Sequence, residues 1–273
     1  MLRQAGLASL EVQMVSGESA VTSSYATNPM KLLAPRSRGR SVWAYTSSFG
    51  GGLVAGDQTR LEVQLCAGAR CFLGTQASNK IYRNPASLPS GHETRATLEA
   101  GSLLVFAPDP VQAFAGSMYS QRQRFDLAPD ASLVLLDWFT SGRAARGERW
   151  ECSRFGSRNE VFVDGRCVFL DSLLLSPDDG DLVSSHRLGR FNCVATVFLL
   201  GPALDSITTR LLEAIKSEPV ARRSDLVFSA SPLANGAVLR IAGVSVESVG
   251  RMIHHHLQPV SELLGDDPWS RKW

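Results

Sequence analysis

Alternating apolar and polar residues predict β-strands over most of positions 9–175. In residues 60–65, Leu61, Val63 and Leu65 alternate with polar side chains, which is the period of a half-buried strand. Similar runs recur with turn residues between them, at 69–74, 102–106, 121–127, 133–138, 149–155, 160–163 and 168–175. This spacing predicts a mainly β body, a large β-sandwich or barrel-like stack.

One turn is predicted in detail. Asp164 and Gly165 lie between two apolar runs in the sequence VFVDGRCVF. A two-residue hairpin loop of type I′ needs positive φ at both positions, which Asp-Gly tolerates. We therefore expect a β-hairpin at this point.

The pattern changes from about residue 186, where helical spacing appears. Residues 193–201, 225–231 and 237–243 read as strands, whereas 203–217 and the segment opening at Ser245 place apolar residues three or four positions apart. Pro259 disturbs the second helix. We expect an α+β portion with few helices at 181–273, packed on a β-rich body at 1–180. The two parts join near 176–181 or form one continuous domain.

The composition narrows the function classes. The chain has 273 residues, 44% of them hydrophobic, and 28 basic against 26 acidic residues give a net charge of +2. A net charge this small predicts that the protein binds neither nucleic acid nor an anionic membrane surface. No apolar run reaches the length of a membrane span. Five scattered cysteines indicate buried, reduced thiols and a cytoplasmic protein.

The stretch SSFGGGLVAGD at 47–57 resembles a phosphate-binding loop only superficially. Such a loop continues with Lys and Ser or Thr into a helix, whereas Asp57 and a predicted strand follow here. Gly50, Gly52 and Gly56 also lack the spacing of a dinucleotide fingerprint. Two interpretations stay open: a tight turn with a solvated Asp57, or a bend that leaves the Asp57 carboxylate facing inward.

Two other segments concentrate polar side chains. Residues 74–83 carry Thr75, Gln76, Ser78, Asn79, Lys80, Tyr82 and Arg83, which form either a ligand site or a surface turn. The segment LLDWFTSGRAARGERWE at 135–151 mixes arginines with acids, and this favours a paired network. If Asp137 or Glu148 faces the interior, each needs a partner or a metal ion.

The histidines and cysteines give little support for a closed metal site or a catalytic centre. His254, His255 and His256 are consecutive, so on a helix they fan over about 200° and do not converge on one ion. We expect His256 to be partly buried, His255 to face away, and His92 to lie in a loop. The sequence contains no G-x-S-x-G, H-E-x-x-H or C-x-x-C motif.

An ordered set of motifs resembles the urease accessory protein D family (UreD, called UreH in some organisms). The motifs are PMKLLAP, SSFGGGLVAGD, GTQASNKIYR, LLVFAPDPVQAFAGSMYSQ, LLDWFTSGRAARGE and the closing LLGDDPWSRKW, from about residue 29 to the last tryptophan. The resemblance implies a mostly β, non-enzymatic chaperone with no permanent cofactor. It also implies binding to apo-urease with the F and G accessory proteins, and nickel in transit through an internal tunnel.

The resemblance assigns candidate roles to individual residues. Nickel accepts oxygen and nitrogen ligands, and dispersed carboxylates bind it weakly enough to release it. Asp57 and Glu148 match acids of the family motifs and are the main candidates for the path, and the weaker candidates are Asp137, Glu160 and Asp171. The residues assigned to architecture or partner contacts are Gln76, Lys80, Tyr82 and Arg143. Two alternatives remain, an enzyme that uses the cluster from Thr75 to Arg83 and a metal-independent β-rich interaction module.

Overall fold

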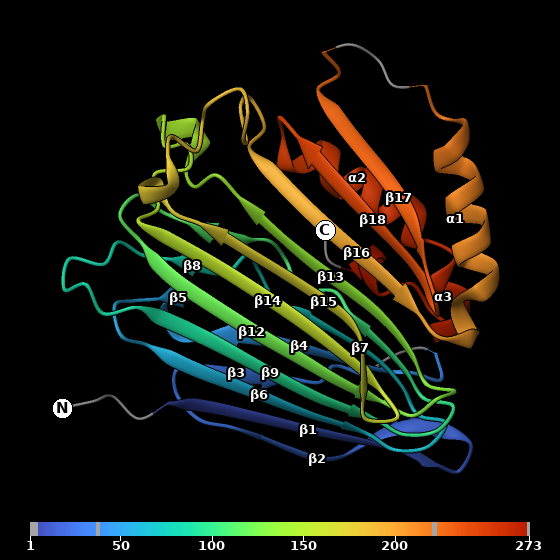
Figure 1. The fold of residues 1–273 in the computed structure, drawn as a ribbon. Coiled ribbons are helices and arrows are strands. Elements are labelled where there is room, and N and C mark those ends of the chain that lie inside the picture. The colour runs from blue at the N-terminus through green and yellow to red at the C-terminus, as the bar shows by residue number, and fades with distance from the viewer. Residues whose placement is uncertain (1–4, 37–38, 220–222, 272–273) are drawn as a thin grey trace.

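The computed structural model describes residues 5–36, 39–219 and 223–271, and their fold is mainly β, as predicted (Figure 1). One sheet, here the outer sheet, has the order β15-β14-β12-β9-β6-β1-β2. Its strands are β15 (Arg166–Leu175), β14 (Arg154–Val163), β12 (Met118–Leu127), β9 (Ser90–Leu98), β6 (Gln58–Leu65), β1 (Gly6–Val15) and β2 (Glu18–Ala26).

The second sheet, here the helix-bearing sheet, follows the order β17-β18-β16-β13-β10-β7-β4-β3 and has a side branch, β11-β8-β5. The main strands are β17 (Leu226–Leu233), β18 (Gly236–Gly243), β16 (Cys193–Leu200), β13 (Ser132–Thr140), β10 (Leu103–Phe106), β7 (Arg70–Thr75), β4 (Val42–Ser48) and β3 (Met30–Leu33). The branch consists of β11 (Val111–Ala113), β8 (Lys80–Ile81) and β5 (Gly52–Leu53).

Between β6 and β14 the chain alternates between the two sheets in a solenoid-like arrangement. Neighbouring strands within each sheet run parallel here, as in the pairs β6–β9, β9–β12 and β12–β14. Parallel register places matching positions of successive strands in rows that cross the sheet. One such row, Val63, Ala96, Phe125 and Val161, is fully apolar and belongs to the core between the sheets.

The helices lie on one face of the helix-bearing sheet, against β16, β17, β18 and β7 (Figure 1). They are α1 (Asp205–Ser217), α2 (Val246–Leu257) and α3 (Val260–Leu264), and the 3₁₀ turns are Phe49–Gly51, Ala144–Arg146, Pro177–Asp179, Pro202–Leu204 and Pro268–Arg271. Ser245 caps α2 by accepting a hydrogen bond from the Ser248 amide, as its position at the predicted helix start suggests. Because β16 pairs with β13, the C-terminal strands extend the sheet of the body.

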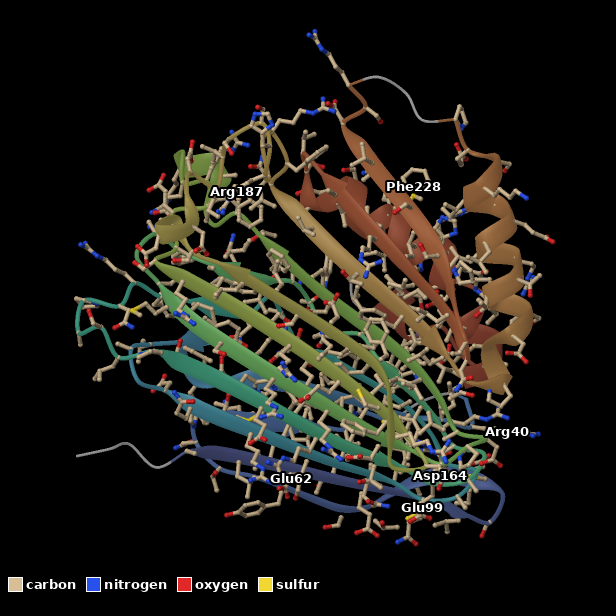
Figure 2. The ribbon with its side chains drawn as sticks, in the orientation of Figure 1. Arg40, Glu62, Glu99, Asp164, Arg187 and Phe228 are labelled. Carbon is tan, nitrogen blue, oxygen red and sulfur yellow. The ribbon has the colours of Figure 1, made fainter. Side chains whose placement is uncertain are left out.

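The hairpin prediction is confirmed, and Asp164 lies at the tip of the β14–β15 turn with φ of 49°, followed by Gly165 with φ of 72° (Figure 2). The strand predicted at 149–155 is wrong, because β14 begins only at Arg154. Trp150 has a positive φ of 56° and packs its buried indole against Phe139, which requires a bend rather than extended backbone.

The cysteine prediction holds in part. All five thiols are free, and Cys71, Cys152 and Cys193 are buried. Cys167 is exposed on β15 and Cys66 is half-buried, so the expectation that all are buried is wrong for these two. Among the described residues, no helix is long and apolar enough to cross a bilayer.

Candidate functional site

Two rows of mostly polar side chains lie between the sheets, beside the apolar row. They arise from the parallel register of β6, β9, β12 and β14, which aligns polar residues of the same parity. We call them the polar rows; their members are Thr59, His92, Gln121 and Ser157 in the first, and Leu61, Thr94, Gln123 and Asn159 in the second. The interior of the body is therefore not a uniform hydrophobic core.

His92 connects the two polar rows. Its Nδ1 lies 2.8 Å from Thr59 Oγ1, and its Nε2 lies 3.1 Å from Thr94 Oγ1. Burial lowers the pKa of His92 to about 4, so the imidazole is neutral near pH 7. A neutral imidazole has one donor nitrogen and one acceptor nitrogen, which the two hydroxyl groups can match. The prediction that His92 lies in a loop is wrong, because it belongs to β9.

Asp137 faces the polar rows from β13 of the opposite sheet. Its Oδ1 accepts a 2.7 Å hydrogen bond from Gln121 Nε2, and its Oδ2 accepts from Ser157 Oγ at 2.5 Å and Asn159 Nδ2 at 2.8 Å. The residue is only 7% exposed, and all three donors are neutral. Burial raises the pKa of Asp137, the three hydrogen bonds oppose this shift, and the charge of Asp171 adds to it.

The helix-bearing sheet divides next to Asp137. Strand β13 pairs with β10 up to Leu135, opposite Phe106, and with β11 from Phe139, opposite Val111. Strands β10, β7 and β4 thus form one arm, and β11, β8 and β5 form the other. We call this point the fork, and Asp137 lies at its base.

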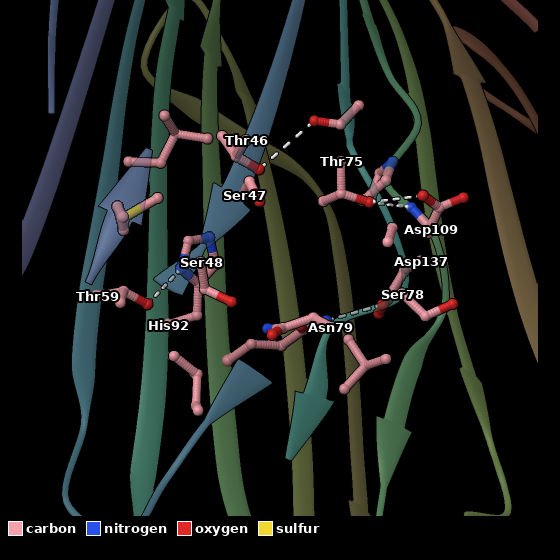
Figure 3. A pocket seen from close by; sticks show the side chains of 18 of the residues that line it. Thr46, Ser47, Ser48, Thr59, Thr75, Ser78, Asn79, His92, Asp109 and Asp137 are labelled. Carbon is pink, nitrogen blue, oxygen red and sulfur yellow. Dashed lines mark hydrogen bonds between the residues drawn. The ribbon is translucent and has the colours of Figure 1, made fainter. Parts of the chain in front are cut away.

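A cavity of about 100 Å³ opens at the fork and reaches the polar rows, because Asp137, His92, Gln121 and Gln123 all line it. Figure 3 shows it with Thr59 and His92 on one side and Thr75 and Asp109 on the other. Thr75 Oγ1 donates to Asp109 Oδ2 at 3.1 Å and accepts from the Asp109 amide at 2.7 Å. These bonds tie the segment between β10 and β11 to the end of β7.

A second hollow of about 640 Å³ lies outside the fork, against α2. Its walls are mainly apolar and include the indoles of Trp138 and Trp269. It shares the lining residues Ala77, Ser78, Pro108, Asp109 and Trp138 with the inner cavity. Trp138 Nε1 donates to the Pro108 carbonyl at 2.7 Å, which stabilises this boundary. The fork therefore brings the polar interior close to the outer face of the sheet.

The glycine stretch forms a tight bend with close backbone approach, a feature that both interpretations above share. Gly50 and Gly51 have φ of 77° and 69°, and a Cβ on Gly52 would lie 2.2 Å from the Lys80 carbonyl oxygen. Asp57 is largely buried, at 8% exposed, and its Oδ2 accepts a 3.0 Å hydrogen bond from the Val54 amide. Its carboxylate lines a surface hollow of about 450 Å³ beside the bend.

Tyr82 and Arg143 connect several of the predicted motifs. Tyr82 Oη donates to the Gly50 carbonyl at 3.0 Å, and its ring meets Phe114 edge-on at 5.6 Å. The Arg143 guanidinium lies 4.5 Å from the centre of the same Phe114 ring and forms an ion pair with Glu148. The Arg143 hydrogen bonds lower the pKa of Glu148, so this acid is ionised and already paired.

The remaining candidates lie in other surroundings. Glu160 is on the outer face of β14, between Arg122 and Arg158 at 2.9 Å each, and the Arg158 hydrogen bond lowers its pKa most. Asp171 lies 3.7 Å from Arg240 on β18. The side chains of Gln76 and Lys80 are exposed. Within residues 5–36, 39–219 and 223–271, no three His, Cys, Asp or Glu side chains come close enough together to hold a metal ion.

The consecutive histidines lie at the end of α2. His254 and His255 are exposed, and His256 is half-buried. His254 Nε2 is 3.9 Å from Asp267 Oδ2, whereas the His255 and His256 rings meet each other at 5.0 Å. Burial, followed by the neighbouring His255, lowers the pKa of His256.

Comparison with known proteins identifies the family. The family model described as UreD urease accessory protein matches residues 4–273. The chain belongs to the UreD family. It is similar to the urease accessory protein UreD of Sorangium cellulosum, at 46% identity over 99% of this chain and 85% of that one. The counterpart from Anaeromyxobacter sp. is 42% identical over 98% of this chain and 90% of its own. Urease accessory protein D of rice, Oryza sativa subsp. indica, is 34% identical over 97% and 95%.

Membership of the UreD family confirms the predicted resemblance and implies a role in urease maturation. These relatives are named accessory proteins, in agreement with a non-catalytic role. The family match begins well before residue 29 and includes the segment 176–260, where the motifs alone gave little resemblance. Lys272 and Trp273, which end the closing motif, lie outside the described residues.

The polar rows were not predicted from the sequence of this UreD chain. In the run MYSQRQRF, the residues at 120–124 are all polar, so the alternation of apolar and polar residues that identifies a buried face is missing there. A signal was nevertheless present, because Gln121 and Gln123 share strand parity with Tyr119 and Phe125, and both aromatic rings are buried. Extending the parity of flanking apolar residues through a polar stretch would have placed both amides inside.

Proposed function

We propose that this chain is a non-enzymatic urease maturation factor, and that it binds apo-urease together with the F and G accessory proteins. In this proposal nickel is the cargo and passes through the polar interior at the fork. The observation that supports it most is the position of Asp137. It is a buried carboxylate with three neutral donors, and it lines a cavity where the sheet divides.

The chemistry of the interior suits a weak and transient contact with a divalent cation. Carboxylate and amide oxygens, hydroxyl groups and a neutral imidazole are all ligands that nickel accepts. One negative charge at Asp137 lowers the large free-energy penalty for moving a cation through protein. Dispersed single ligands favour release, since no closed set of four or more donors has to be broken.

The other acids enter the proposal with different weights. Asp57 stays a candidate, because its largely buried carboxylate lines a hollow beside the glycine bend. Glu148 also stays a candidate, although its pairing with Arg143 reduces its negative potential. Glu160 and Asp171 are each paired with arginine as well.

The main test is Asp137→Asn in cells that co-express urease with its F and G proteins. We expect several-fold less nickel per purified urease, measured by elemental analysis, because the amide keeps the shape but lacks the charge. The matched control is Ser157→Ala, which removes one donor to Asp137 and leaves the carboxylate in place. Normal nickel content in the Asp137→Asn sample would overturn the proposed path.

A pull-down from the same cells separates transport from assembly. If Asp137→Asn co-purifies with urease and the F and G proteins yet lowers nickel, the defect lies in transfer. If the complex itself is lost, the acid supports assembly. A double Asp57→Ala and Glu148→Gln variant that activates urease normally would remove these two acids from the path. A variant set that binds partners without any change in nickel would favour a metal-independent module.

A further inference from the structure

The outer sheet ends in a strand edge that is open over most of its length. Strand β15 pairs with β14 on one side, and within residues 5–36, 39–219 and 223–271 no strand pairs with its other side. The pairing with β14 is regular over positions 169–175, so every second residue there presents its backbone N–H and C=O groups to the open side. Strand β15 contains neither proline nor lysine, two residues that commonly protect such an edge. We call positions 169–175 the β15 edge.

The solvent-facing side of the β15 edge is partly apolar. Leu170 and Leu174 are 51% and 49% exposed. Ser172 lies between them on the same side of the strand, opposite Arg158 of β14, and Leu170 lies opposite Glu160. A strand added at this edge would cover both leucines, and the burial of their apolar surface would stabilise the complex.

The charge beside the β15 edge is positive. Arg122 and Arg158 are neighbours in register across β12 and β14, and both form ion pairs with Glu160. The two arginine side chains are 60% and 44% exposed, whereas the shared carboxylate is largely covered. On the inner side of β15, Asp171 pairs with Arg240 of β18. Three arginines therefore share two acids, and the excess positive charge favours a negatively charged partner.

The surface next to the β15 edge is open to solvent. Strand β15 lies over β16 and β18, since the rings of Phe169 and Phe198 are 4.5 Å apart and Asp171 meets Arg240. The helix-bearing sheet continues beyond β18 with β17, whose Ser229 pairs in register with Arg240 (Figure 1). Ser229 and Arg240 are both exposed. The β15 edge and this exposed sheet face thus form a step that accommodates one more strand.

We propose that the β15 edge docks an extended acidic segment of a partner protein by β-strand addition. An open strand edge selects an extended chain, because backbone hydrogen bonds supply the pairing. Alternate side chains of the added strand lie beside Leu170, Ser172 and Leu174, and this order fits an apolar, an acidic and an apolar residue. The acid is two strand spacings, or roughly 9–10 Å, from the Arg158 backbone, and the small Ser172 side chain lets the guanidinium reach it. This docking is independent of nickel transfer.

The probe is a fluorescein-labelled peptide of about ten residues, the length of β15, in which threonine alternates with valine and glutamate in turn. Fluorescence anisotropy with the full-length chain gives its affinity. A control peptide has glutamine in place of glutamate, and we expect it to bind about tenfold more weakly, with the difference shrinking as salt rises.

Backbone pairing has its own control. Two further peptides of the same sequence carry N-methyl groups on alternate residues, each along a different edge of the extended chain. A methyl group removes a backbone donor, so we expect methylation of the edge that faces β15 to abolish binding. Methylation of the opposite edge should leave the affinity unchanged, a difference that adsorption through side chains alone does not produce.

Variants of the chain test the assignment to the β15 edge. Leu170→Ser with Leu174→Ser should weaken the acidic peptide about tenfold. Arg158→Gln should weaken it about fivefold, and the matched control is Arg95→Gln on β9, a similarly exposed arginine of the same face that lies far from β15 in the strand order. That control should leave the affinity unchanged.

Four results would overturn the proposal. The first is no binding at millimolar peptide, and the second is equal binding of the two N-methylated peptides. The third is unchanged affinity in the double-leucine variant, with circular dichroism confirming that it is folded. The fourth is a dimer of the free chain in sedimentation that the same variant dissociates, because a second copy would then occupy the edge.

Discussion

Asp137→Asn should destabilise the protein by an amount that the hydrogen-bond geometry sets. Both carboxylate oxygens accept, Oδ1 from Gln121 and Oδ2 from Ser157 and Asn159. Whichever way the new amide turns, its NH₂ group faces at least one N–H donor. One buried donor left without an acceptor costs about 1–3 kcal/mol, which is the expected loss in the free energy of unfolding.

The loss should shrink as pH rises. Burial raises the pKa of Asp137 above its unfolded value, so protonation favours the folded state. The wild type has this stability in full below about pH 4 and loses it as pH rises through the folded-state pKa. The asparagine variant has no such titration. The difference in unfolding free energy between wild type and variant is therefore largest in acid.

Urea unfolding of both proteins at about pH 5, 6.5 and 8 measures this difference. Because both chains share every other titrating group, the subtraction isolates Asp137. A difference that stays constant, or that increases with pH, would refute the reasoning and mean that Asp137 is ionised without penalty. Ser157→Ala serves as a control that keeps the titrating carboxylate and should retain the pH dependence.

Three further predictions concern the glycine bend, the ion pair of Arg143 with Glu148 and the start of α2. Gly52→Ala should lower the melting temperature by several degrees, because its Cβ would lie 2.2 Å from the Lys80 carbonyl oxygen; thermal unfolding checks this. Arg143→Ala should lower the free energy of unfolding slightly at neutral pH, because it removes the ion pair with Glu148 at a partly exposed site. That difference should be lost as pH falls from about 4.5 through the lowered folded-state pKa of Glu148, because protonation removes the negative charge of the ion pair. Urea titrations at neutral and at acidic pH test this prediction. Ser245→Ala should destabilise the chain by about 1 kcal/mol through loss of the α2 cap, measured in the same way.

Much of the fold follows from local patterns. Period-2 alternation located β6, and the Asp164-Gly165 pair located the β14–β15 turn, because both signals act over a few residues. The solenoid-like winding was not predictable in this way. The winding depends on which strands pair across thirty or more residues of sequence; Thr59 of β6, for example, pairs with His92 of β9. The alternation of side chains along one strand does not specify its partner strand.

The site was less accessible to sequence reasoning than the fold. The motifs identified Asp137 as a candidate, yet its importance comes from register, since only the parallel pairing places Gln121 beside Ser157. The run at 149–155 was assigned to a strand from its alternation of apolar and polar residues, whereas the Trp150 backbone has a positive φ and its indole packs against Phe139. Tertiary contacts, which no local pattern encodes, decided both outcomes.

The stability and nickel measurements together distinguish an architectural acid from one that meets the cargo. A domain of this kind has about 5–15 kcal/mol of stability, so a loss of about 1–3 kcal/mol leaves more than nine-tenths of the molecules folded. A several-fold fall in urease nickel with Asp137→Asn is too large for unfolding to explain. Ser157→Ala disturbs the same network while the charge stays in place. If both variants lose nickel equally, the shape of the polar rows limits transfer; if only Asp137→Asn does, the negative charge at the fork is what the cation requires.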